Sequence, residues 1–374
     1  MKLLFAGDVV LKEHSKIREK NLLGKKLYNL VGEQDIACCD LECPIYISNQ
    51  TEIPKRGPSD YNEEKCLERL SLAGFNMVTM ANNHIMDYGK RGLENTINKL
   101  KDNGHFRYIG AGMTENEIYR IEKIQDEENK IVIGIISVAE TSFGTSHNGN
   151  PGCARFLGRK MEELLRRGKK ECNYLIVVCH GGAEELNVPL PEFRDVYKSF
   201  IDIGADLIIA HHPHVIQGRE IYAGKEIYYS LGNFAYDTEI SGKPYNPMGL
   251  CVCADIDSKG IGTKAYTVGY ADGQVEIMDS DDLFIQACLL LQNTEKYINT
   301  VNEFCIGIYQ KYFRTYYALV IGLNILSEDD MQEFIEHRWR GDDIRWDDLF
   351  VYHNIAIETN RWICERAIRL INKI

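Results

Sequence analysis

The chain has 374 residues, 44% of them hydrophobic, which is enough for one large domain with an appendage or for two domains. Lys and Arg total 43 against 55 for Asp and Glu, and this net charge of -12 argues against nucleic acid as a partner while allowing a local basic pocket. Asp8 interrupts the first apolar run too early for a secretion signal, and no later run reaches the ~20 apolar residues of a membrane helix. We therefore expect a cytoplasmic protein with no direct membrane anchor, in which the 12 cysteines are reduced core thiols.

Short apolar, β-prone runs alternate with longer amphipathic stretches, and this alternation predicts an α/β sheet protein. In chain order the strand-like runs are KLLFAGD, IACCDLE, MVTMANNH, IVIGIISVAE, LIVVCHGG, DLIIAHHPH and EIYYSLGNF. Between them, residues 62–74 and 90–104 have helical spacing and end on Gly74 and Gly104, which suit helix C-termini.

The sequence changes character in its second half. From residue 243, turn residues separate two or three strand-like runs, which we expect at the edge of a sheet. After residue 280, long helical patterns replace them. We therefore predict one domain over residues 1–280 and a helical C-terminal region over residues 281–374.

Polar side chains follow six of the strand-like runs, at the point where each run ends. These residues are Asp8, Glu42, Asn83 with His84, His180, His212 with His214, and Asn233. Because functional residues gather at the carboxyl ends of strands in open α/β sheets, we expect them at one edge. Imidazole and carboxylate oxygen bind divalent transition metals, and two metals about 3.5 to 4 Å apart need six or more such ligands. Asp8, Glu42, Asn83, His180, His212 and His214 would supply that set.

Pro213 has a specific part in this hypothesis. It fixes φ at about −65° and would help hold the backbone between two histidines that face different ions. Taken singly, each residue also has an ordinary explanation, since a lone histidine is often a surface or hydrogen-bonded group, and Asp and Asn often cap helices or close turns. The hypothesis rests on all of them lying at the ends of apolar runs.

At these motifs the sequence resembles the CapA proteins, a branch of the calcineurin-like metallophosphoesterase superfamily associated with poly-γ-glutamate capsule synthesis. The resemblance covers roughly residues 1–280 and rests on FAGDVVL, DLECPI, LAGFNMVTMANNHIMDYGKRGLENTINKL, HGGAEE and GADLIIAHHPHVIQGREIYAGKEIYYSLGNF. It implies a four-layer α/β sandwich of two mixed sheets flanked by helices, with a two-metal site for Mn, Fe or Zn ions at the strand ends. Val10 and Glu42 depart from the wider superfamily, which has His and Asp there, but CapA proteins resemble this chain in both respects.

The resemblance also implies roles for individual residues. Asp8, Glu42, Asn83, His180, His212 and His214 match metal-binding positions, and His84 matches a catalytic imidazole that protonates the leaving oxygen of a phosphoester. Asp87 could orient His84 or form a salt bridge elsewhere. Arg56 is a candidate anion clamp or a solvated loop residue. His211, Glu184 and Asn233 complete the candidate site as groups next to the ligands or the substrate.

Two functions of different classes follow from this resemblance. The first is a metal-dependent hydrolase of a phosphoester or related anionic substrate, small or polymeric, that uses a water activated by two metal ions. The alternative is a non-hydrolytic accessory protein of capsule or poly-γ-glutamate synthesis, and a decayed metal site is a third hypothesis that the intact ligand set disfavours. We expect either a homodimer or a capsule-synthesis protein as partner, and the helical tail could cover the site or form the dimer contact.

Overall fold

The computed structural model describes residues 1–12, 21–55, 57–236, 248–271, 273–313 and 346–373. Their contacts divide the chain into two compact units. The first comprises residues 1–53 and 58–294, and the second comprises residues 54–57 and 295–374. Arg56 lies outside the described residues.

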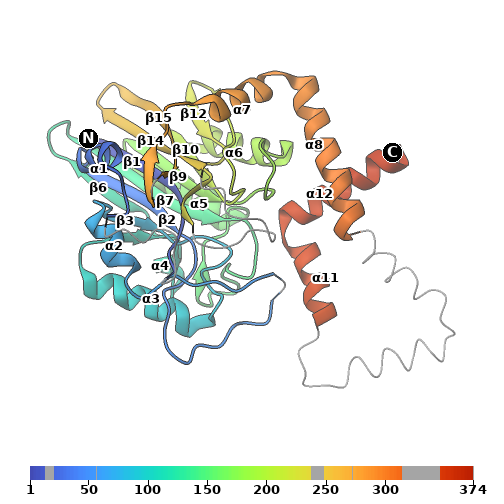
Figure 1. Ribbon diagram of the computed structural model, residues 1–374, viewed down its shortest axis with the longest axis horizontal. Helices are drawn as coiled ribbons and strands as arrows, with labels where there is room; N and C mark the ends of the chain where they lie inside the picture. The colour runs from blue at the N-terminus through green and yellow to red at the C-terminus, as the bar shows by residue number, and fades with distance from the viewer. Residues whose placement is uncertain (13–20, 56, 237–247, 272, 314–345, 374) are drawn as a thin grey trace. The chain divides into compact units, whose positions relative to one another are not determined.

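The first unit contains two mixed β-sheets (Figure 1). In the described residues the first sheet has eight strands, seven in the order β16-β15-β14-β1-β2-β3-β4, with β13 paired to β1. β1 runs parallel to β2 and β13 but antiparallel to β14. The strands are β1 Lys2–Val10, β2 Ile36–Leu41, β3 Met77–Thr79, β4 Arg107–Ile109, β13 Asn233–Tyr236, β14 Met248–Asp257, β15 Gly260–Ala271 and β16 Gln274–Ile277. The expectation of edge strands after residue 243 is thus confirmed by β14, β15 and β16.

The second sheet has six strands in the described residues, in the order β11-β12-β10-β9-β7-β6. Its central strands β7, β9, β10 and β12 are parallel, and the outer strands β6 and β11 are antiparallel to their neighbours. The strands are β6 Glu122–Asp126, β7 Ile131–Ala139, β9 Tyr174–His180, β10 Leu207–His211, β11 Arg219–Tyr222 and β12 Lys225–Tyr228. A short pair, β5 Ala111–Gly112 and β8 Gly152–Cys153, lies apart from both sheets.

Alternating side chains of the two sheets pack against each other to form a buried core. Phe5 and Cys38 of the first sheet share one cluster with Ile135, Ile176 and Ile209 of the second. Successive side chains of a strand point to opposite faces of the sheet, so every second residue faces the other sheet.

Helices cover the outer faces of the sheets and complete four layers (Figure 1). The other face of the first sheet packs on α1 Lys25–Gly32, α2 Cys66–Leu72 and α3 Gly89–Asn103. α5 Arg159–Glu171 packs on β7 and β9 of the second sheet and on α6 Pro191–Ile203. The short helix α4 spans Glu115–Ile118, and α7 Asp282–Gln292 contacts β11 within the first unit. The predicted sandwich of two mixed sheets flanked by helices is confirmed.

The helix ends agree with the sequence at one position and differ at another. Gly104 ends α3 in the left-handed conformation at φ 66°, as predicted. The segment expected to be helical from residue 62 becomes helical only at Cys66. The reason is Asn62, which forms a β-bridge with Ile45 and whose side-chain oxygen accepts a hydrogen bond from the Leu11 amide at 2.9 Å. Asn62 thereby ties the ends of two strands to the segment before the helix.

The second unit is helical in its described residues from 295 onward. It contains α8 Thr294–Ile308, which continues into a π-helical turn, η1 Tyr309–Phe313, and it also contains α11 Trp346–Ala356 and α12 Glu358–Asn372. α12 contacts both α11 and η1. The helical pattern predicted after residue 280 is therefore present, and its first helix, α7, belongs to the first unit.

Candidate metal centre

The carboxyl ends of the parallel strands of both sheets meet at one edge of the sandwich. The first sheet brings Asp8 within β1, Glu42 just after β2, and Asn83 and His84 after β3. The second sheet brings His180 and His211 as the last residues of β9 and β10, with His212 and His214 following. The structure therefore brings together side chains from segments more than 200 residues apart in the sequence.

The first group of side chains surrounds Nε2 of His180. This atom lies 2.9 Å from Asn83 Oδ1, 3.1 Å from His212 Nδ1 and 3.7 Å from Glu42 Oε1. Two imidazole nitrogens, an amide oxygen and a carboxylate oxygen thus face a common point. Glu42, His180 and His212 can each direct one ligand atom to within 4.8 Å of the others.

The second group surrounds His214. Its Nδ1 lies 3.0 Å from Asn233 Oδ1 and 3.5 Å from Asp8 Oδ2, and its Nε2 lies 3.8 Å from Glu42 Oε1. Asn233 begins β13 opposite Asp8 in the parallel register of β1. Glu42 therefore belongs to both groups and lies between them.

His84 and Asp87 form a pair beside these groups. His84 Nδ1 lies 2.6 Å from Asp87 Oδ2, and its Nε2 lies 4.0 Å from Glu42 Oε1. The Asp60 amide donates to the same Asp87 oxygen at 2.8 Å. Asp87 is thus placed to orient His84 so that Nε2 faces the site.

The remaining predicted residues differ in depth. His211 is 1% exposed, and its Nδ1 lies 2.8 Å from Asp8 Oδ1, so it contacts a predicted ligand from inside the fold. Glu184 is exposed and can bring a carboxylate oxygen within 4.8 Å of ligand atoms of His212 and His214. Glu184 therefore lies at the surface of the site and His211 beneath it.

The backbone around the histidines is strained. His212 and His214 have φ values of 97° and 58°, in the left-handed region that side-chain-bearing residues rarely adopt. Cys43, which follows Glu42, has φ 93°. Such conformations concentrate at functional sites because surrounding contacts must hold them. Here they turn His211, His212 and His214 in three different directions.

Burial and charge shift the pKa values of the site residues. Burial acts to raise the pKa of Asp8, but hydrogen bonds from His211 and His214 outweigh it and hold that pKa well below its ordinary value. Burial raises the pKa of Glu42 well above its ordinary value, against the attraction of His214. The pKa of His212 is well below its ordinary value because it is buried beside His180 and His214.

These observations test whether the residues fit a divalent metal. Both carboxylate oxygens of Glu42 are buried and accept no hydrogen bond from any described residue. A buried carboxylate without donors is costly unless a cation or a proton compensates it. The surrounding imidazole nitrogens and carboxylate oxygens are the ligands that divalent transition metals prefer. The residues therefore fit such an ion.

Two carboxylates at the site were not predicted from the sequence. Asp40 is 1% exposed, and its Oδ2 lies 3.1 Å from His180 Nδ1. Glu140 follows β7, and its Oε1 lies 3.7 Å from His212 Nε2. The sequence did hold a signal for both, because Asp40 precedes Glu42 by two residues and so shares its side of the strand, and Glu140 ends the run IVIGIISVAE.

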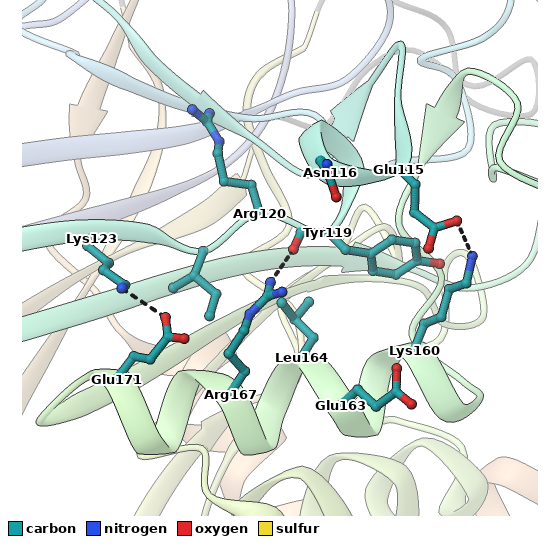
Figure 2. Close-up of a pocket in the computed structure, with 11 residues that line it drawn as sticks. Glu115, Asn116, Tyr119, Arg120, Lys123, Lys160, Glu163, Leu164, Arg167 and Glu171 are labelled. Carbon is teal, nitrogen blue, oxygen red and sulfur yellow. Dashed lines mark hydrogen bonds and ion pairs between the residues drawn. The ribbon is translucent and has the colours of Figure 1, made fainter.

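A separate cleft of about 470 Å³ lies between α4, β6 and α5, and none of the predicted site residues lines it (Figure 2). Several of its charged side chains pair within the cleft. Lys123 lies 2.8 Å from Glu171, Lys160 pairs with Glu115, and Arg167 donates to the carbonyl of Tyr119 at 2.6 Å. The cleft therefore offers no cluster of groups comparable to the one at the strand ends.

The two mixed sheets flanked by helices, with carboxylates and imidazoles at the carboxyl edge of both sheets, define an α/β sandwich protein with a candidate metal centre. The chain belongs to the bacterial capsule synthesis protein family PGA_cap, whose sequence model matches residues 2–238. The resemblance to CapA proteins is thereby confirmed. In the described residues no helix is both long enough and apolar enough to cross a membrane.

Relatives with known names support the family. The capsule biosynthesis protein CapA of Bacillus anthracis is 26% identical over 252 residues, 63% of this chain and 59% of that protein. The PGA biosynthesis protein CapA of Bacillus subtilis (strain 168) is 27% identical over 240 residues, 62% of each chain. A probable polyglutamine synthesis accessory protein of Mycobacterium tuberculosis is 27% identical over 176 residues, 44% of this chain and 46% of that protein. The chain thus spans about three fifths of the length of the two Bacillus relatives.

Solved structures resemble the chain more distantly. A hypothetical protein from Thermus thermophilus has a TM-score of 0.46 at 14% identity, over 72% of this chain and 100% of that chain. A 5'-nucleotidase precursor from the same organism has a TM-score of 0.41 at 11% identity, over 80% of this chain and 58% of that chain.

Proposed function

We propose that this chain is a metal-dependent hydrolase of a phosphoester or related anionic substrate. The observation that carries the proposal is the position of Glu42. Its Oε1 lies 4.0, 3.7 and 3.8 Å from the Nε2 atoms of His84, His180 and His214. A buried carboxylate facing three imidazoles, and lacking any hydrogen bond from the described residues, is what a metal-binding centre requires.

The ligand groups suggest how metal would be held. Asp8, Glu42 and His214 would form one position, and Glu42, Asn83, His180 and His212 would form the other. Imidazole and oxygen ligands suit Mn, Fe or Zn. Bound divalent ions supply Lewis-acid activation of a phosphoryl group and of the attacking water.

The protein's own groups have separate tasks. Asp87 fixes the ring of His84 through Nδ1, which directs Nε2 toward the substrate side. His84 would then hold the proton that passes to the leaving oxygen. Asp8 keeps its negative charge because two histidines donate hydrogen bonds to it. Glu184, at the exposed rim, would contact the substrate or an outer ligand.

The names of relatives favour a second candidate function. The Mycobacterium tuberculosis relative is described as a probable polyglutamine synthesis accessory protein, and the Bacillus relatives as capsule or PGA biosynthesis proteins. In that case the same site would bind a polymeric anion, or a synthesis partner, without hydrolysing it. A homodimer remains part of the proposal in either case.

Elemental analysis of protein purified without chelator tests the first proposal. One or two equivalents of transition metal are expected, falling sharply in a His212→Ala, His214→Ala double variant and unchanged in the exposed control His105→Ala. The metal-loaded protein should hydrolyse p-nitrophenyl phosphate or its diester. Metal-free protein that binds neither Mn²⁺ nor Zn²⁺ would refute the metal centre. Bound metal without hydrolysis of any phosphoester would favour the accessory function.

A further inference from the structure

Asp40 is a buried carboxylate that joins the two sheets at the candidate metal centre. It lies on β2 between Asp8 of β1 and Thr79 of β3 in the parallel register. The Thr79 hydroxyl donates to Asp40 Oδ1 at 2.7 Å. The other oxygen, Oδ2, lies 3.1 Å from Nδ1 of His180 on the second sheet. Neither of these last two atoms has a hydrogen-bonding partner among the described residues, so they face each other at ion-pair distance.

The position of Asp40 determines which nitrogen of His180 can bind a metal. Carboxylate oxygens accept hydrogen bonds, so in a neutral ring the proton is best placed on the Nδ1 atom that faces Oδ2. A neutral imidazole protonated at Nδ1 keeps its lone pair on Nε2. Nε2 is the His180 atom that faces Asn83, His212 and Glu42.

In His212 the two ring nitrogens have the opposite roles, with Nδ1 facing the site and Nε2 facing a carboxylate. Its Nδ1 faces His180 Nε2 at 3.1 Å, and its Nε2 lies 3.7 Å from Glu140 Oε1. In each ring one nitrogen thus faces a carboxylate, and the other faces the common point of the first group of side chains. Such outer carboxylates fix ring orientation and make the imidazole a better ligand.

We propose that Asp40 is a positioning residue, which holds the Nδ1 proton of His180 so that Nε2 binds the metal. This inference rests on the proposed function, because it needs a metal at the site. Asp40 itself is not a ligand in this arrangement, since Oδ1 accepts from Thr79 and Oδ2 faces Nδ1 of His180. The competing arrangement has Asp8, Asp40 and His180 bind an ion directly, which their ligand atoms, all within 4.8 Å, would allow. In that arrangement His180 would have to bind through Nδ1.

Asp40→Asn tests the proposal with little change of shape. The amide oxygen can still accept from His180 Nδ1, but the negative charge is lost. Loss of an outer-shell partner typically lowers metal affinity by about 10- to 100-fold. We expect a loss in this range for Mn²⁺ and Zn²⁺, measured by competition with a chelator at fixed pH, with the number of bound ions unchanged.

Asp206→Asn is the matched control. Asp206 is also a buried aspartate, which accepts a hydrogen bond from the Leu175 amide at 2.9 Å, and it lies at the opposite end of β10. This variant should lose stability without losing metal affinity. If Asp40→Asn does not fold, Thr79→Val tests the same support from the other oxygen and should show a smaller loss of affinity.

Nitrogen NMR of histidine-labelled wild-type protein gives a readout that does not depend on activity. In the Zn²⁺-loaded protein, His180, assigned with a His180→Gln variant, should be protonated at Nδ1 and coordinated at Nε2. Coordination at Nδ1, or loss of a whole equivalent of metal in Asp40→Asn, would overturn the positioning role in favour of a direct ligand. Unchanged affinity in Asp40→Asn would overturn the inference alone. Wild-type protein that binds no metal would overturn the proposed function and this inference with it.

Discussion

Metal binding at the edge of the two sheets should release protons, so the affinity for metal should rise with pH. The group that sets this dependence is His214. Burial acts to lower its pKa, but the charges of Glu42 and Asp8 outweigh burial and raise the pKa to about 10. Glu42, whose pKa is also raised by burial, is a second proton-binding group at the same point.

The magnitude follows from these values. At pH 7 the protonated form of His214 outweighs the neutral form by about 10³-fold. An ion that binds the neutral ring must therefore overcome roughly 4 kcal/mol. At least one proton should leave per ion bound, and affinity should rise by up to about tenfold per pH unit for each proton released. The metal-free fold should show the opposite trend. A His pKa raised from 6.5 stabilises the fold fully below pH 6.5, and this stabilisation is lost as pH rises through about 10.

Titration calorimetry with Mn²⁺ in two buffers of different ionisation enthalpy counts the released protons. We expect one or more for wild-type protein, about one fewer for His214→Gln, and no change for the exposed control His105→Gln. Release of no proton between pH 6 and pH 8, together with an affinity independent of pH, would refute the electrostatic argument.

Three further predictions concern catalysis and packing. His84→Gln should lower phosphoester turnover by about 10²- to 10⁴-fold with the metal content unchanged, because it removes a proton donor and no proposed ligand; lost metal would contradict this role. Gly7→Ala should lower the free energy of unfolding by about 1 to 3 kcal/mol, because the added Cβ would lie 2.1 Å from the Gly232 carbonyl oxygen. In Gly262→Ala the added Cβ meets no atom within 4 Å, so this variant should be as stable as the wild type. Phe5→Ala, between the sheets, should lower the free energy of unfolding in urea by about 3 to 5 kcal/mol, and an effect as small as that of exposed Leu72→Ala would show that the core is misassigned.

The sequence was sufficient to predict the main apolar strands and which of their ends carry polar groups, but not the short strands β4, β6 and β11. Apolar strands can be recognised from local sequence, and functional residues gather at the carboxyl ends of strands in α/β sheets. Together these two facts place Asp8, Glu42 and His180 at one edge. Gly104 was predictable for the same reason, because a helix ending in the left-handed conformation favours glycine.

The orientation of side chains within the site was not predictable in this way. Residue type does not reveal that His212 and His214 adopt positive φ, which sends three neighbouring histidines in different directions. Nor does spacing show which ring nitrogen of His180 faces Asp40, because the two residues lie on different sheets. Helical spacing likewise predicted α7 without showing that it packs on β11.

The division of the candidate ligands between two sheets has a consequence for assembly. Asp8, Glu42 and Asn83 come from one sheet, and His180, His212 and His214 lie at or just after the ends of strands of the other. Neither sheet alone carries enough donors for a tight site, so an ion would act as a cross-link that forms only after the sheets have docked. Metal retention would then report on completed folding, because the first sheet takes β1–β4 and β13–β16 from the two ends of the chain and the second sheet takes its strands from between them.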